Sequence, residues 1–142
     1  MAINVLYRTK ATASGGRTGT VKSEDGAFEA QLALPKAMGG AGGAGTNPEQ
    51  LFAAGYSACF GSAVQFVAGQ QKTKIGNIDV EAEVGIGPRE EGGFGLTVAL
   101  KATIEGVDQA TAEALVAEAH KVCPYSNATR GNVDVQVSAA AR

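Results

Sequence analysis

The chain has 142 residues, of which 44% are hydrophobic and 18% are charged, and its formal net charge is -2. This size and composition fit one globular domain, residues 1–142, and exclude a generally disordered protein. The slight negative charge leaves no basic surface for nucleic acid, and no basic cluster suggests binding to a membrane surface.

The first part of the chain predicts three strands. Residues 3–13 are rich in Val, Ile, Tyr and Thr and alternate weakly, and a Ser-Gly-Gly turn follows them. The chain then returns in a second strand, residues 17–22, and residues 28–34 alternate apolar and polar side chains as a third.

A long helix is predicted from Asn47 to about Gln70. Asn47 can cap its first turn, and Pro48 suits the first helical position. Apolar residues occur on nearly all of its faces, which predicts a buried central helix.

Two strands, a helix and a last strand follow. Residues 78–86 and 94–104 predict a hairpin, and residues 108–122 predict a helix that Pro124 ends. Residues 133–137 predict the final strand. The order of three strands, helix, two strands, helix and strand predicts an α+β domain with antiparallel sheets and a buried central helix. The inward residues of the second helix are expected to be Ala112, Leu115, Val116 and Ala119.

The glycine-rich segment before the first helix matches a dinucleotide-binding pattern only in its letters. Gly40 to Gly45 reads G-x-G-x-x-G, but the position where an acidic residue should meet the ribose falls inside the first helix. A loop or an active-site lid is the preferred interpretation.

The cellular compartment is expected to be the cytoplasm. The N-terminal run lacks the apolar region of a signal peptide, and no uninterrupted apolar stretch is expected to span a bilayer. Thiols stay reduced in the cytoplasm, so a permanent disulfide is not expected there. One His and two Cys cannot by themselves complete a structural zinc site, and no bound metal or cofactor is expected.

The two cysteines, Cys59 and Cys123, allow two interpretations. Their separation of 64 residues matches no local motif, so on spacing alone each is a small buried side chain. A reactive thiolate in the middle of an apolar helix would need a nearby cation, because burial raises a thiol pKa and the helix dipole acts mainly in the first turn. The residues leave the choice among the five arginines open: Arg8, Arg17, Arg89, Arg130 and Arg142.

Two longer motifs surround these cysteines. The first, residues 46–60, reads TNPEQLFAAGYSACF, and the second, residues 122–132, reads VCPYSNATRGN. Both resemble the cysteine motifs of the organic hydroperoxide resistance proteins, which belong to the OsmC/Ohr superfamily. The resemblance covers essentially the whole chain, and the Cys-Pro-Tyr-Ser-Asn-Ala segment favours the organic hydroperoxide resistance branch over the OsmC branch.

The resemblance implies a thiol peroxidase that reduces alkyl and lipid hydroperoxides in antioxidant defence. Cys59 would be the peroxidatic nucleophile and Cys123 the resolving cysteine, which together form a redox-active disulfide. Arg17 would hold the Cys59 thiolate, and Glu49 would orient Arg17 through a bidentate ion pair. The family also implies an intertwined homodimer and dihydrolipoyl groups on lipoylated proteins as the external reductant.

Helix geometry adds one hypothesis about the dimer. Glu49 and Cys59 lie ten residues apart on one predicted helix, which separates them by roughly 15 Å at about 1.5 Å per residue. We therefore expect Arg17 and Glu49 to serve Cys59 of the partner subunit. The alternative is a break in the helix near Gly55.

Three alternatives remain open from the sequence. His120, one turn before Cys123, could act as a base for that thiol, although a His in a last helical turn more often just interacts with the helix dipole. The protein could belong to the OsmC branch, with broader use of peroxides. It could also be a thiol redox sensor or an apolar-ligand carrier without turnover.

Overall fold

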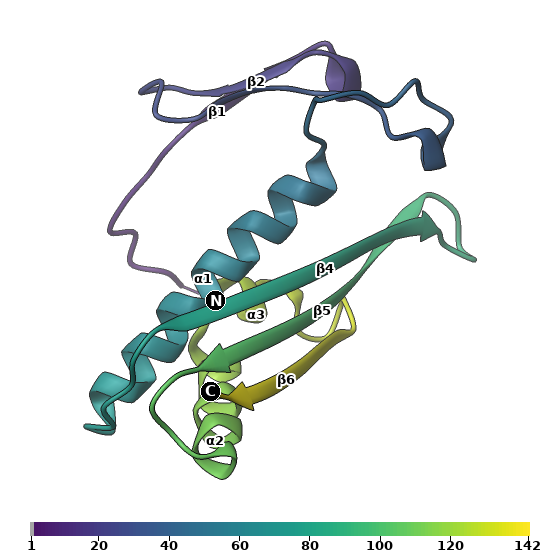
Figure 1. Ribbon diagram of the computed structural model, residues 1–142. Helices are drawn as coiled ribbons and strands as arrows, with labels where there is room; N and C mark the ends of the chain where they lie inside the picture. Colours follow the sequence, from purple (N-terminus) through teal and green to yellow (C-terminus); the bar gives the residue numbers. More distant parts are fainter. Residues whose placement is uncertain (1) are drawn as a thin grey trace. The chain divides into compact units, whose positions relative to one another are not determined.

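The computed structural model describes residues 2–142 (Figure 1). The chain divides into two units, one ending at Pro48 and the other running over Glu49–Arg142. This division does not test the single domain expected from the sequence, which stays a prediction.

The first unit contains a three-stranded antiparallel sheet in the order β1-β2-β3. Its strands are β1 (Ala11–Ser14), β2 (Thr20–Ser23) and β3 (Glu29–Gln31), with one short 3-10 helix after β1 (η1, Gly16–Thr18) and another after β3 (η2, Lys36–Met38). The three strands are confirmed, but they are shorter than predicted. The reason is pairing: β2 offers only four residues, so β1 is a strand only from Ala11, where it pairs with Ser23.

Arg17 lies in a turn rather than in the predicted second strand. It is the middle residue of η1 and comes directly after two glycines with positive φ: Gly15, which precedes η1, at 82° and Gly16, the first residue of η1, at 57°. Glycine adopts this left-handed geometry without the steric cost that a side chain would bring. The turn therefore holds Arg17 half-buried at one end of the small sheet.

The glycine-rich segment forms close backbone turns within the first unit. The main-chain N–H groups of Gly40 and Gly42 donate to the carbonyls of Pro35 and Leu34, at 3.0 Å each. A Cβ at Gly40 would lie 2.2 Å from the Leu34 carbonyl oxygen, and one at Gly45 would lie 2.6 Å from the backbone of Ala33. The close packing of this loop thus explains why glycines occupy these positions. No nucleotide is needed to explain them.

The second unit joins three helices to a second three-stranded sheet, in the order β4-β5-β6. The elements are α1 (Pro48–Gln70), β4 (Ile78–Pro88), β5 (Phe94–Ile104), α2 (Gln109–Val122), α3 (Pro124–Thr129) and β6 (Val135–Ala141). Strands β4 and β5 form the predicted hairpin, with Ile78 opposite Ile104 and Pro88 opposite Phe94. The α+β class and the order of the long elements are confirmed.

The pairing of β6 differs from the expectation of purely antiparallel sheets. Strand β6 runs parallel to β5, with Val98 opposite Val135 and Ile104 opposite Ala141. The helices α2 and α3 separate the two strands and return the chain to the start of β5, and a crossover of this length permits parallel pairing. Figure 1 shows the three strands side by side, with α2 along the sheet.

The core of the second unit lies between α1, α2 and one face of the sheet. Alternate residues of β5 are buried, as expected of a strand with one covered face. All four inward residues predicted for α2 are buried, with exposed fractions of 3% or less. The main buried side chains are Tyr56, Phe60, Val64 and Val67 of α1, Val98, Leu100 and Ile104 of β5, and Leu115 of α2.

Helix α1 has the predicted extent but not the predicted burial. One face packs in the core, while Phe66 remains 57% exposed. By length and composition alone, α1 also meets the criterion for a helix that could cross a membrane, although polar residues interrupt its apolar sequence. The core helix of a soluble protein passes the same test, and Tyr56, Phe60 and Val64 are fully buried against the sheet and α2.

Candidate active site

The fold brings the two cysteines together. Cys59 lies on α1 and is half-buried, whereas Cys123 lies between α2 and α3 and is fully buried. Their sulfur atoms are 3.7 Å apart, although 64 residues separate them in the sequence. A disulfide bond is about 2.05 Å long, so the two sulfurs need to approach by less than about 2 Å to form one. Both thiols are free in this structure.

Pro124 creates the bend that presents Cys123. Helix α2 ends at Val122, and Cys123 has the extended backbone, with φ -62° and ψ 124°, that a residue before proline prefers. Pro124 then occupies the first position of α3, a short helix that was not predicted. A proline is well suited to that position, because the first turn of a helix has no acceptor for its N–H. This signal in the sequence could have revealed α3.

Burial alone makes Cys59 a poor thiolate. Desolvation raises its pKa, and the nearby thiol of Cys123 raises it further, while a hydrogen bond from the main-chain N–H of Tyr125 opposes them by lowering it. The net result is a pKa above the ordinary value for cysteine. A reactive Cys59 therefore needs a cation, as the sequence argument also requires.

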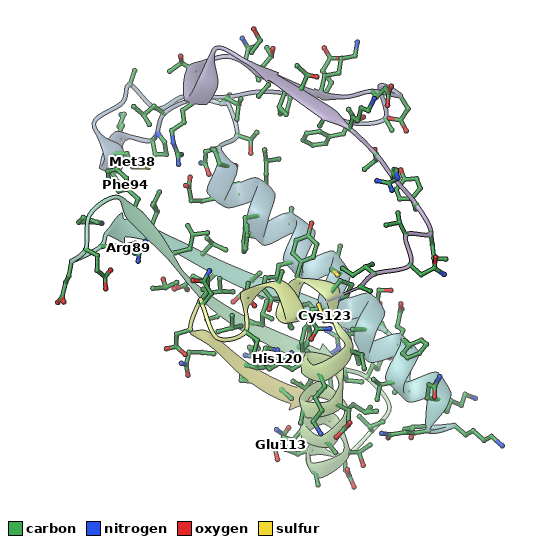
Figure 2. All side chains as sticks on the ribbon, turned by 180° about the vertical axis from the view of Figure 1, so that it is seen from behind. Met38, Arg89, Phe94, Glu113, His120 and Cys123 are labelled. Atoms are coloured by element: carbon green, nitrogen blue, oxygen red, sulfur yellow. The ribbon has the colours of Figure 1, made fainter. Side chains whose placement is uncertain are left out.

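A network of buried hydroxyl groups links α1 to the two helices on either side of Cys123, and it was not predicted from the sequence. The hydroxyl of Tyr56 lies 2.8 Å from Ser126 Oγ and 3.2 Å from Thr129 Oγ1. His120 Nδ1 lies 2.8 Å from the same Ser126 oxygen. His120 is thus bonded to Ser126, a contact that was not predicted when His120 was considered as a base for Cys123 or as a partner of the helix dipole. Figure 2 labels His120 and Cys123, which lie near each other at the end of α2.

Gly55 explains how α3 comes so close to α1. A Cβ at Gly55 would lie 2.9 Å from the hydroxyl oxygen of Tyr125. The rings of Phe52, Tyr56 and Tyr125 gather at this place, with centroids 5.6–6.3 Å apart. Helix α1 continues through Gly55 without interruption, which rules out the break considered above.

A largely apolar pocket opens beside Cys59. Its volume is about 370 Å³, and it is lined by Cys59, Ser62, Ala63, Phe66, Val122 and Pro124. All of these residues come from α1 and from the junction of α2 with α3. The pocket can receive a small apolar molecule with one end against the Cys59 sulfur. Its lining residues could not be identified from the sequence.

Arg17 and Glu49 lie in different units of the chain. Arg17 is in η1 of the first unit, and Glu49 is in the first turn of α1. Because α1 is continuous, Glu49 and Cys59 are separated by roughly 15 Å along its axis. Among residues 2–142, no three His, Cys, Asp or Glu side chains come together as a metal site.

Comparison with known proteins identifies the family. The profile of the OsmC-like proteins matches residues 40–138. The chain is similar to the organic hydroperoxide resistance protein of Xanthomonas axonopodis pv. citri, with 54% identity over 137 residues and 96% of each chain covered. It is also similar to OhrB of Bacillus subtilis, with 46% identity, 93% of this chain and 96% of the relative covered. The chain belongs to the organic hydroperoxide resistance family of OsmC-like proteins.

Solved structures of this family have the same fold. An organic hydroperoxide resistance protein from Legionella pneumophila is 54% identical, with a TM-score of 0.92 and coverage of 96% of this chain and 99% of that one. One from Elizabethkingia anophelis is 51% identical, with a TM-score of 0.94 and coverage of 99% and 100%. A Vibrio cholerae relative, 52% identical with a TM-score of 0.92 and coverage of 98% and 95%, holds captopril in one of its active sites. These similarities confirm the family predicted from the two cysteine motifs and the α+β fold class predicted from the order of strands and helices.

Proposed function

We propose that this protein is a thiol peroxidase that reduces organic hydroperoxides to alcohols, in antioxidant defence. The observation that carries the proposal is the pair of reduced sulfurs, Cys59 and Cys123, held 3.7 Å apart beside an apolar pocket. The names of its relatives, organic hydroperoxide resistance proteins, agree with this substrate class.

The reaction has three steps. The Cys59 thiolate attacks one oxygen of the hydroperoxide, the O–O bond breaks, and the departing alkoxide takes up a proton to become an alcohol, which leaves Cys59 as a sulfenic acid. The Cys123 thiol then attacks that sulfur, forms the disulfide and releases water. An external dithiol is finally oxidised to its own disulfide and restores both thiols.

The pocket supports a preference for organic hydroperoxides over hydrogen peroxide. Phe66, Val122 and Ala63 give it apolar walls, and Cys59 lies on its surface. An alkyl group that enters it leaves water, which is favourable by roughly 25 cal/mol per Å² of buried apolar area. Hydrogen peroxide has no apolar surface to bury, so it gains nothing from these walls.

We expect Arg17 to supply the cation that Cys59 needs and Glu49 to orient it, in a site completed by the partner subunit. The reason lies in α1: without a break at Gly55, Glu49 and Cys59 of one helix are roughly 15 Å apart. A guanidinium bound to Glu49, near the start of the helix, would thus be far from Cys59 of the same helix. A homodimer also accounts for the exposed apolar side chains of Phe66 (57%) and Val122 (43%), which a second copy could cover.

Mixed dimers test whether the site is shared. A dimer of one Cys59→Ser chain and one Arg17→Ala chain keeps one complete site if Arg17 acts across the interface. It keeps none if Arg17 acts within its own chain. We expect such dimers to show about half of the parent activity, because one site of two remains, while each variant alone is inactive. Inactive mixed dimers would refute the shared site.

The expected reductant is a dihydrolipoyl group on a lipoylated protein. A dithiol suits the step chemically, because after its first sulfur attacks the disulfide its second sulfur can resolve the mixed disulfide. A monothiol such as glutathione lacks that second group and should support slower turnover. The cytoplasm, where such reductants keep thiols reduced, remains the expected location.

Steady-state consumption of peroxide with dihydrolipoamide tests the proposed function. We expect fast turnover on tert-butyl hydroperoxide, slower turnover on hydrogen peroxide, and none in Cys59→Ser. Equal rates on both peroxides would favour the broader peroxide use considered for the OsmC branch. Absence of dithiol-driven turnover on either peroxide would refute the peroxidase and favour a thiol sensor or an apolar-ligand carrier.

A further inference from the structure

The buried hydroxyl network connects the two segments that carry the cysteines. Tyr56 precedes Cys59 by one turn of α1, and its hydroxyl lies 2.8 Å from Ser126 Oγ. His120 and Ser126 stand three residues before and three residues after Cys123, and they are bonded to each other at 2.8 Å. The His120–Ser126 bond therefore spans the bend at Cys123, and the Tyr56–Ser126 bond fastens that bend to α1.

The hydrogen bonds of this network can run in only one direction if all its contacts are satisfied. Thr129 Oγ1 contacts the main-chain carbonyls of Tyr125 and Ser126, at 3.0 and 3.2 Å, and a carbonyl only accepts. Thr129 must therefore donate its hydrogen to them and accept from the Tyr56 hydroxyl. Tyr56, having used its one hydrogen, accepts from Ser126.

The same reasoning assigns the proton on His120. Ser126 donates its single hydrogen to Tyr56, so its oxygen must accept from His120 Nδ1. Neutral His120 is thus the tautomer with hydrogen on Nδ1 and a lone pair on Nε2. The opposite direction would leave Thr129 without its bond to a carbonyl and lose one hydrogen bond overall.

The network is protected from water and insensitive to protonation of the imidazole. Tyr56 and Ser126 are fully buried, and Thr129 is 5% exposed. Burial, followed by the charge of Arg130, lowers the pKa of His120, which is therefore neutral at neutral pH. Protonation adds a hydrogen at Nε2 and leaves the Nδ1–H bond to Ser126 intact. The chain of bonds ends at main-chain carbonyls, so it carries no proton to Cys59.

We propose that His120, Ser126 and Tyr56 are positioning residues for the resolving step, holding Cys123 in the place from which it attacks the Cys59 sulfenic acid. This inference rests on the proposed function and assigns roles that the two cysteines alone do not explain. The three side chains fix α3, which also carries the Tyr125 N–H that reaches Cys59. Loss of the network leaves the attacking sulfur less often within reach, while attack on the peroxide by Cys59 continues.

Single-turnover kinetics separate the two steps. Ser126→Ala removes the bonds to both Tyr56 and His120. We expect closure of the disulfide to slow by at least about ten-fold, because the loss of one buried hydrogen bond already corresponds to roughly that factor. Formation of the sulfenic acid at a pH where Cys59 is fully ionised should change by less than about two-fold on the same scale. The matched control is Ser57→Ala, which removes an exposed hydroxyl of α1 that donates to the Ala54 carbonyl within the same helix. It should close its disulfide at the parent rate.

Two substitutions of His120 test the assigned tautomer. His120→Asn places an amide N–H where Nδ1–H stands and should keep closure near the parent rate. His120→Asp has nearly the same shape as His120→Asn but, when ionised, only accepts, so it reverses the network at the loss of one hydrogen bond and should close more slowly than His120→Asn. Equal behaviour of the two variants, or equal slowing of both chemical steps in Ser126→Ala, would overturn the proposal.

A peroxide-free measurement keeps this test separate from that of the proposed function. The equilibrium between the Cys59–Cys123 pair and dithiothreitol reports how well the fold holds the sulfurs together. If the parent fails to reduce peroxide, the proposed function fails. If Ser126→Ala forms its disulfide as readily as the parent in this equilibrium, the positioning role fails.

Discussion

Oxidation of the two thiols should stabilise the protein strongly. The Cys59–Cys123 disulfide would close a loop of 64 residues. In the chain-entropy description, a loop of that length removes enough disorder from the unfolded chain to add about 4 kcal/mol to the free energy of unfolding. The sulfurs already lie 3.7 Å apart, so little strain in the folded state should offset this gain.

Thermal unfolding of the reduced and the oxidised protein measures this effect. For a chain of this size, about 4 kcal/mol corresponds to a rise in Tm of roughly 10–15 °C. Both forms are compared at one protein concentration, with the disulfide verified by thiol titration. The control is Cys123→Ala, whose Tm should not depend on the oxidant. An oxidised protein with an equal or lower Tm would refute the reasoning, because it would mean that closure disrupts the packing around the cysteines.

Three further substitutions test the structure. Phe60→Ala should lower the free energy of unfolding in urea by about 3–5 kcal/mol, because Phe60 is fully buried. Phe94→Ala, at a position 72% exposed, should change it by less than about 0.5 kcal/mol. Similar changes in unfolding free energy for both variants would contradict the described core. Burial raises the pKa of Cys59, and the neighbouring thiol of Cys123 raises it further. Cys123→Ala should therefore shift the pH midpoint of Cys59 alkylation by iodoacetamide downward. An upward shift would show that the Cys123 thiol does not raise this pKa. Phe66→Ala should reduce kcat/KM for tert-butyl hydroperoxide by about ten-fold and leave that for hydrogen peroxide unchanged, since only the alkyl group contacts the ring; equal loss on both would exclude Phe66 from substrate binding.

The long elements were predictable because their sequence signals are strong and local. Both helices can be located from the sequence. Pro48 marks the start of α1, Asp108 marks the start of α2, and apolar residues recur along each helix after these positions. The Asp108 side chain accepts a hydrogen bond from the Thr111 N–H at 2.8 Å, as the capping pattern predicts. The short strands of the first unit were overextended, since the length of a strand depends on its partner and not only on its own residues.

Other features depend on contacts between distant segments and have weak local signals. The parallel pairing of β6 with β5 follows from the path of α2 and α3, which alternation along one strand cannot reveal. The exposure of Phe66 could not be predicted, because a composition that is apolar on all faces does not say which face the rest of the chain covers.

The chemistry of the site was predictable only in part. The pairing of Cys59 with Cys123 came from the resemblance of two motifs, and the distance between the sulfurs agrees with it. The hydroxyl network was missed because Tyr56 and Ser126 lie 70 residues apart and each has an ordinary local environment. The catalytic roles expected for Arg17 and Glu49 stay predictions, and the mixed dimers test that of Arg17.

The proposed mechanism requires that Cys59 reacts with the hydroperoxide and that Cys123 of the same chain then attacks the Cys59 sulfenic acid. Intact mass measurement and peptide mapping, after one equivalent of tert-butyl hydroperoxide is added to the reduced protein, test it most directly. The parent should lose two hydrogens and yield a Cys59–Cys123 linked peptide, while Cys123→Ser should gain one oxygen at Cys59. Unmodified cysteines, or a disulfide that joins two chains instead, would contradict it.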